Sequence, residues 1–227
     1  LVNFFSPTKN LKEGEKIFTI NLNEDRSNYF QSNTINGRLI TPLALCLHYA
    51  WEILKTNNFE QEIDVVFEEV KVFKATIDVP DDNVVNLTVI VPKGTQKFEI
   101  MAAKTLLVTG KIRITNAPNE ERVKLCNSYI NEAKSFVLNH EDFYLEMEMR
   151  GYNYSDASKN VCKSSVDGSR ALIKWNNNWV TFMDTAFQLF VFGSDLRDIL
   201  LPILIRKIVI DLKLHKLSTE TLQGKIF

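Results

Sequence analysis

Cysteine is scarce in this chain of 227 residues. The three cysteines, Cys46, Cys126 and Cys162, lie far apart, and none belongs to a CxxC or Cys/His pattern with the spacing of metal ligands. We therefore expect no structural zinc site, and the sequence predicts no cofactor. A sparse and odd number of cysteines fits a reducing compartment, which favours a cytoplasmic location.

Glycine and excess charge are also lacking. The chain has only eight glycines, none in a phosphate-binding loop, and a net charge of -1. A near-neutral balance gives no electrostatic reason to bind nucleic acid or an anionic membrane. No apolar run reaches the roughly 20 residues that span a bilayer, and the apolar start of the chain lacks the basic residues of a secretion signal. Because it starts without Met and ends in mid-pattern, we expect a piece of a larger protein.

Apolar residues make up 45% of the sequence, and fifteen of them are Phe. The clearest element is a helix over 43–55 that is apolar almost all round, with Thr41 as its expected N-cap and Pro42 as its first residue. A helix without a polar face must be covered on most sides. Strand-like segments flank it at 16–22, 63–73, 84–91, 98–101 and 105–115. These patterns predict an α+β fold in which a sheet curls around the helix.

The second half repeats this arrangement in outline. A polar break at 116–121 is followed by helical patterns over 120–136 and 142–149, and a loop-rich stretch precedes a strand at 169–175. A second apolar helix is predicted over 180–192, ended by Gly193, with a further strand at 203–212.

Several of these segments resemble the dehydratase domain of animal-type fatty acid synthases and related polyketide synthases. That family has a His-x-x-x-Gly-x-x-x-x-Pro motif before a buried helix with a Trp near its end, and Gly37, Pro42 and Trp51 hold those positions here. Four more segments resemble the family in the expected order: 106–115, 143–154, 178–188 and Leu201-Pro202.

The resemblance implies a double hot dog, in which two curled antiparallel sheets each wrap a long helix. It divides the chain into a first hot dog (1–116), a linker with a helix (117–138) and a second hot dog (139–227) that is incomplete at its end. The implied partners are an acyl chain on an acyl carrier protein domain, the other domains of a multifunctional synthase and, for the parent, a second copy.

The family dehydrates β-hydroxyacyl thioesters with a His base from the first hot dog and an Asp acid from the second. Asp184 matches the acid, but Asn33 occupies the position of the His. A carboxamide has no useful basicity at neutral pH. The resemblance also implies that Gln188, Gly37, Pro42 and Tyr154 contact the substrate.

Two further departures concern residues that the resemblance places at the acyl tunnel. Leu45 replaces a Gly of the first helix, and 155–159 replace a Gly-Pro-x-Phe-Gln segment. These changes predict a pseudo-dehydratase, that is, a domain with the dehydratase fold and weak or absent dehydratase activity. We expect that restoring a His at Asn33 recovers little of that activity. His48, His140 and His215 do not have the spacing to replace it. Two alternatives stay open: a working dehydratase with an altered site, and a hot-dog thioesterase in which Asp184 and Gln188 direct a water molecule.

Overall fold

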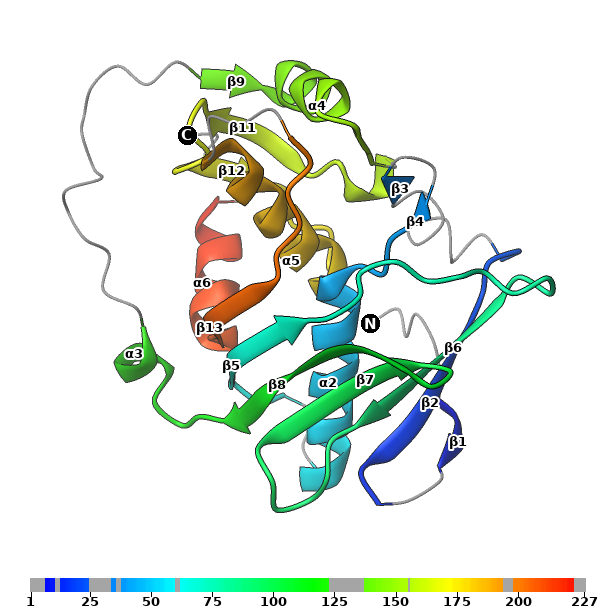
Figure 1. Ribbon diagram of the computed structural model, residues 1–227. Coiled ribbons are helices and arrows are strands. Elements are labelled where there is room, and N and C mark those ends of the chain that lie inside the picture. Colours follow the sequence, from blue (N-terminus) through cyan, green and yellow to red (C-terminus); the bar gives the residue numbers. More distant parts are fainter. Residues whose placement is uncertain are drawn as a thin grey trace.

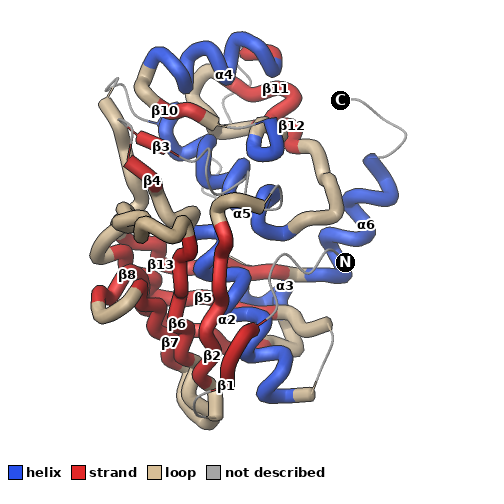
Figure 2. The backbone as a smooth tube through the Cα atoms, turned by 90° about the vertical axis from the view of Figure 1, so that its right-hand side faces the viewer, coloured by secondary structure: helices blue, strands red, loops and turns tan. Residues whose placement is uncertain are grey.

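The protein folds into a large antiparallel sheet that packs on one long helix, with a smaller layer of helices and short strands at one end (Figures 1 and 2). The computed structural model describes residues 7–10, 13–24, 34–35, 38–59, 62–122, 137–154, 156–193 and 198–222. The strands are β1 Pro7–Asn10, β2 Glu15–Asn21, β3 Thr34–Ile35, β4 Arg38–Leu39, β5 Val65–Val72, β6 Val84–Ile90, β7 Lys97–Ala102, β8 Thr105–Ile114, β9 Val137–Asn139, β10 Tyr152–Asn153, β11 Val161–Ser165, β12 Ala171–Ile173 and β13 Leu204–Ile210. The helices are α2 Leu43–Asn58, α3 Pro118–Glu121, α4 His140–Met149, α5 Trp179–Gln188 and α6 Leu212–Leu222, with short 3-10 turns at Asp156–Ser158 and Leu189–Gly193.

The large sheet has seven antiparallel strands in the order β1-β2-β6-β7-β8-β5-β13 and is open at both edges. Alternating side chains of its strands point to the core, as Val85, Leu87 and Val89 do in β6. Helix α2 lies on this inner face, and its apolar side chains, including Trp51, are almost wholly buried. The arrangement of a sheet around an apolar helix is the one predicted from the sequence.

The predicted cap of this helix is wrong by one residue. Pro42 itself is the N-cap in an extended conformation, and the helix begins at Leu43. The backbone N–H of Thr41 donates to the carbonyl of Ala75 at 2.8 Å, so Thr41 still belongs to an extended segment. Its hydroxyl group is buried and has no hydrogen-bond partner in the described part of the chain.

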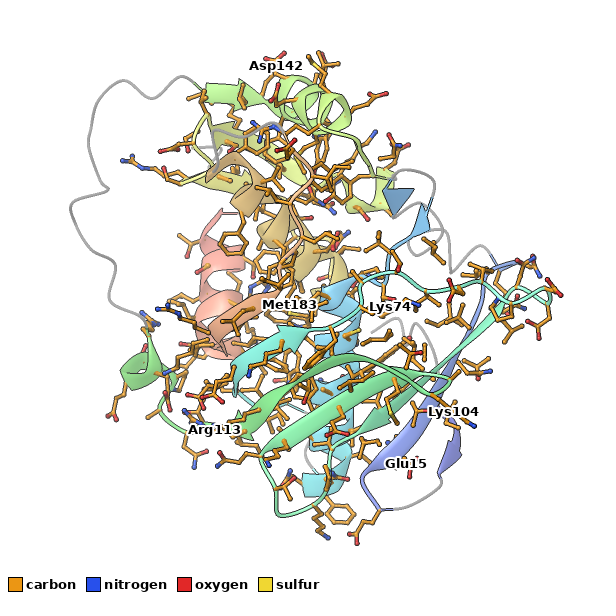
Figure 3. The ribbon with its side chains drawn as sticks, in the orientation of Figure 1. Glu15, Lys74, Lys104, Arg113, Asp142 and Met183 are labelled. Carbon is orange, nitrogen blue, oxygen red and sulfur yellow. The ribbon has the colours of Figure 1, made fainter. Side chains whose placement is uncertain are left out.

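Helix α5 is the second central helix, and it packs against α2 through an edge-to-face contact of Trp179 with Trp51. Asn178 caps it, because its side-chain oxygen accepts from the backbone N–H groups of Val180 and Thr181. The predicted helix over 180–192 is thus shorter and continues as a 3-10 turn. Met183 of α5 belongs to the same hydrophobic core as α2 (Figure 3). A second hydrophobic core is formed by α4, β11 and the 3-10 turn at Leu189–Gly193.

Strand β13 joins the two halves of the sequence. It pairs with β5 along its length, so a strand from the predicted second hot dog lies at the edge of the large sheet. Glu121 of α3 strengthens this junction by binding Arg113 of β8 at 2.7 Å and Lys207 of β13 at 2.6 Å. Residues 123–136, where the linker helix was predicted, lie outside the described residues, and the domain boundaries stay a prediction. No helix in the described ranges is both long and apolar enough to cross a membrane.

Candidate active site

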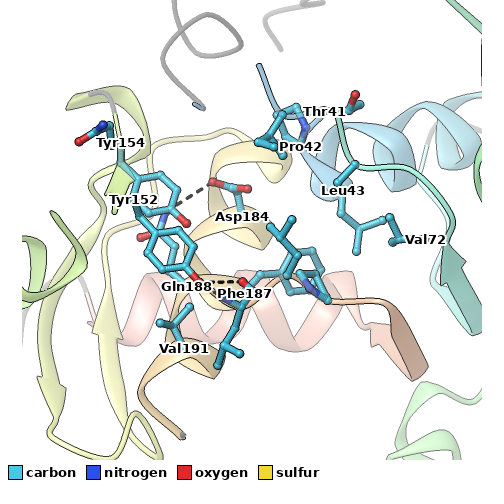
Figure 4. A pocket seen from close by; sticks show the side chains of 16 residues that line it. Thr41, Pro42, Leu43, Val72, Tyr152, Tyr154, Asp184, Phe187, Gln188 and Val191 are labelled. Atoms are coloured by element: carbon cyan, nitrogen blue, oxygen red, sulfur yellow. Dashed lines mark hydrogen bonds between the residues drawn. The ribbon is translucent and has the colours of Figure 1, made fainter. Parts of the chain in front are cut away.

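A pocket opens where the start of α2, strand β10, helix α5 and the segment before β13 meet (Figure 4). The volume open to the centres of water molecules is about 100 Å³. The described residues that line it are mainly apolar: Ile40, Thr41, Pro42, Leu43, Val72, Ala75, Tyr152, Asn153, Tyr154, Asp184, Phe187, Gln188, Val191, Leu200, Leu201 and Pro202. Such a pocket with few polar groups is typical of a site for a largely apolar ligand.

Asp184 supplies the only carboxyl group among these residues. It projects from α5 between the side of the pocket formed by Tyr152 and Tyr154 and the start of α2 (Figure 4). Burial raises the pKa of Asp184 to about 7, although a hydrogen bond from Gln188 acts in the opposite direction. A carboxyl group that is about half protonated at neutral pH can donate a proton to a leaving group or accept one.

Gln188 lies one helical turn after Asp184, on the same face of α5. Its amide nitrogen donates to Asp184 Oδ2 at 3.4 Å and to the carbonyl of Ser158 at 3.0 Å, and its amide oxygen accepts from the Tyr144 hydroxyl at 3.0 Å. With only 2% of its surface exposed, the side chain is occupied by protein partners.

Tyr152 and Tyr154 form the opposite wall, with ring centroids 6.1 Å apart and nearly parallel planes. The Tyr152 hydroxyl donates to the carbonyl of Leu200 at 2.7 Å and accepts from its N–H, which fixes the wall formed by Leu200, Leu201 and Pro202. Burial raises the pKa of Tyr154 well above its usual value, and the charge of Asp184 adds to this. Tyr154 therefore stays protonated at neutral pH.

The structure brings together four of the six predicted site residues: Asp184, Gln188, Pro42 and Tyr154 all line the pocket. The other two, Asn33 and Gly37, lie outside the described residues. The sequence prediction missed Tyr152, although it belongs to the same motif as Tyr154. Its hydroxyl holds Leu200 in place, and a contact with a residue so distant in the sequence leaves no local pattern.

Two reasons given for a degenerate site do not hold for this pocket. Leu45 is 2% exposed, packs in the core under the sheet and is not a lining residue. Asp156 and Lys159 lie at the surface, where their charged groups are 3.7 Å apart. Ser158, at the position of the family's Phe, is buried behind α5, where its carbonyl accepts from Gln188. Ser155 lies outside the described residues, and the other replacements add no bulk or charge to the described pocket.

None of the three histidines is among the described residues that line the pocket. His48 lies on α2, where burial lowers its pKa to about 4. The ring of His140 is hydrogen-bonded to the carbonyl of Val161 at 2.8 Å, and the ring of His215 packs against those of Trp175 and Trp179. The described pocket thus offers an acid but no imidazole base.

The metal-ligating residue types do not gather anywhere in the described ranges. No group of three or more His, Cys, Asp or Glu side chains there could hold a metal ion.

No protein-family model matches the sequence. The fold, however, is similar to that of solved polyketide synthase dehydratase domains. The dehydratase domain from the CurF module of curacin polyketide synthase matches with a TM-score of 0.68 and 18% identity, over 90% of this chain and 81% of that one. The dehydratase domain of RzxB from Pseudomonas fluorescens matches with a TM-score of 0.67 and 14% identity, over 91% and 82% of the two chains. The predicted double hot dog fold class is confirmed, with sheets that are not closed.

Proposed function

We propose that the chain is a dehydratase-like domain of a multifunctional fatty acid synthase, with a structural or acyl-binding role and weak or absent dehydration. The observation that carries the proposal is Asp184, the single carboxyl group among the described residues that line an apolar pocket of a dehydratase-type fold. The resemblance of 143–154 and 178–188 to the dehydratase domains of fatty acid synthases and related polyketide synthases supports such a parent, and a polyketide-synthase-like parent is its alternative form.

The chemistry follows from the groups around the pocket. Dehydration of a β-hydroxyacyl thioester needs an acid to protonate the departing hydroxyl and a base to remove the proton next to the carbonyl. Asp184, with a pKa of about 7, is suited to the first task. For the second, Asn33 stands where the family has a His, and the described lining residues add no imidazole or amine. Loss of such a base typically lowers a rate by about 10²–10⁴-fold.

The pocket also indicates the kind of ligand. Leu43, Val72, Phe187 and Val191 give it apolar walls that suit an acyl chain. We therefore propose acyl groups on an acyl carrier protein domain as ligands and other domains of the synthase as partners. The reducing compartment predicted from the cysteines and the homodimeric parent implied by the resemblance belong to the same proposal.

A second candidate is a working dehydratase with an altered site. It is favoured by Asp184, because a carboxyl group that exchanges its proton near pH 7 can act as acid and, when ionised, as base. A thioesterase is less well supported. Its water would need a free polar group beside Asp184, and the amide of Gln188 is already bonded to Tyr144 and Ser158.

One assay separates these functions. The protein is incubated with a β-hydroxyacyl thioester and, separately, with a trans-2-enoyl thioester, and both the enoyl absorbance and free thiol are followed. We expect interconversion at no more than about one hundredth of the rate of a dehydratase with an intact His. Interconversion at the full rate would refute the pseudo-dehydratase, and release of free thiol would favour the hydrolase.

Restoring the base tests the reason for the low activity. Because Leu45 and Asp156–Ser158 leave the pocket unobstructed, we now expect Asn33→His to raise the dehydration rate, rather than to give the little rescue predicted from the sequence. The matched control is Asn33→His combined with Asp184→Asn, which restores the base and removes the acid. An equal gain in both variants would show that the activity does not use Asp184.

A further inference from the structure

The side chain of Gln188 is held behind Asp184 by hydrogen bonds to two other segments and to Asp184 of its own helix. Its oxygen Oε1 accepts from the Tyr144 hydroxyl at 3.0 Å, and its nitrogen Nε2 donates to the Ser158 carbonyl at 3.0 Å and to Asp184 Oδ2 at 3.4 Å. An amide nitrogen has two hydrogens, so both donors are used. The Gln188 side chain thus reaches Asp184 only with its nitrogen in this orientation.

The reverse orientation of the amide matches its neighbours less well when Asp184 is ionised. It would place Oε1 against the carbonyl oxygen of Ser158 and a carboxyl oxygen of Asp184, neither of which donates when the carboxyl is ionised. It would also place the NH2 group against the Tyr144 hydroxyl, whose oxygen already accepts from the N–H of Val161 at 3.1 Å, and would leave that hydroxyl only the more distant Ser158 carbonyl, at 3.4 Å, as an acceptor. Leaving buried polar groups without good partners is costly, so the hydroxyl and the Ser158 carbonyl together select the observed orientation.

Tyr144 is itself fixed by the structure around it. It is 7% exposed, and its ring packs edge-to-face against His140 and Phe143 on α4, with centroids 5.0 Å away in both cases. His140 binds the carbonyl of Val161 at 2.8 Å while Tyr144 binds the N–H of the same residue. Strand β11 therefore holds the phenol from one side, and the phenol holds Gln188 from the other.

We propose that Tyr144 is a positioning residue of the site, whose hydroxyl orients the Gln188 amide so that Nε2 donates to Asp184. No contact of Tyr144 with the pocket is needed for this, because it acts through Gln188. The role in a reaction rests on the proposed function of Asp184 as the acid. The orientation itself concerns only the three side chains.

The donated hydrogen bond has two effects on Asp184. It favours the ionised form and therefore opposes the rise in pKa that burial causes. It also engages Oδ2 and leaves the other carboxyl oxygen for a ligand in the pocket. A loss of the Tyr144 hydroxyl should weaken this bond and raise the pKa of Asp184 further.

The test is a titration of Asp184 by carbon-13 NMR, on protein labelled at aspartate carboxyl groups and without substrate. It compares the wild type with Tyr144→Phe, Gln188→Met and the double variant. We expect each single substitution to raise the pKa of Asp184 by about half a unit to one unit. The double variant should show no more than the larger single shift, because both changes remove the same bond.

The matched control is Tyr49→Phe, which removes a hydroxyl group from another buried tyrosine that does not line the pocket. That hydroxyl has no hydrogen-bond partner among the described residues, so its loss should leave the titration of Asp184 as in the wild type. The proposal is overturned if Tyr144→Phe behaves like this control, or if the shifts of the two single variants add. Should Tyr144→Phe fail to fold, an unchanged pKa in Gln188→Met also overturns it, because Tyr144 then has no bond to orient.

This result is separable from the proposed function. The titration needs no turnover, so a protein without dehydratase activity can still show the coupling. A missing coupling, in turn, leaves the activity assays with both thioesters unaffected.

Discussion

Replacing Asp184 by Asn should stabilise the protein at neutral and alkaline pH but not at acid pH. In the folded state the pKa of Asp184 is raised to about 7, from a usual value of 3.8, by burial among apolar pocket walls. Below pH 4 the carboxyl is protonated in both the folded and the unfolded chain. Between pH 4 and 7 the unfolded chain loses this proton and the folded chain keeps it, so the free energy of unfolding falls as pH rises.

The size of the effect follows from the shift in pKa. A difference of about three units, at 1.36 kcal/mol per unit, gives roughly 4 kcal/mol, and water in the open pocket reduces this to about 2–4 kcal/mol. Asparagine has no proton to lose and can still accept the bond from Gln188 through its amide oxygen. The variant should therefore gain this amount over the wild type above pH 7.

The measurement is urea unfolding of the wild type and of Asp184→Asn at intervals from pH 4 to pH 8.5. Asp156→Asn makes the same substitution at an exposed carboxyl group and gives the baseline for the substitution itself. A difference between wild type and Asp184→Asn that stays constant over this range would refute the reasoning. It would mean that the Asp184 carboxyl is in contact with bulk water, and its role as a proton donor at neutral pH would lose its basis.

Three other substitutions test the fold. Trp51→Ala should lower the free energy of unfolding by about 3–5 kcal/mol in urea titrations, because the side chain is fully buried in α2. Asn178→Ala removes two hydrogen bonds at the start of α5 and should cost about 1 kcal/mol in the same assay, whereas Asn178→Asp should cost less. Glu121→Gln should destabilise the protein at pH 7 but much less at pH 3. Arg113 and Lys207 lower the pKa of Glu121 to about 2, so its contribution is present above pH 4.5 and is lost as pH falls toward 2.

The central elements could be predicted from the sequence because their signals are local. Helix α2 has apolar residues on every face, and the side chains of strands such as β6 point alternately to the core and to the surface. The pattern of apolar residues therefore predicts which side chains are buried. Asp184 was predicted from the motif around it, and it lies in the pocket. Its partner Gln188 followed from helical spacing, since four residues form about one turn.

The features that were missed depend on contacts between distant segments. Tyr144 and Ser158 meet Gln188 only because α4, the 3-10 turn at Asp156–Ser158 and α5 fold together, and no spacing in the sequence predicts this. Leu45 illustrates the opposite error. A Gly-to-Leu difference at a motif position suggested an obstructed tunnel, but the orientation of α2 directs this side chain into the core.

The hydrogen bonds around Asp184 bear on whether the site is only structural. Burying a carboxyl group with a pKa of about 7 destabilises the folded state at neutral pH, and an Asn would satisfy the same bond from Gln188 without that cost. A domain that only supports its neighbours therefore has no physical need for the acid. If Asp184→Asn is more stable yet loses acyl-thioester binding or residual dehydration, the carboxyl group serves the ligand. If stability rises and neither ligand binding nor residual dehydration changes, the Asp184 carboxyl group has no role in ligand binding or catalysis.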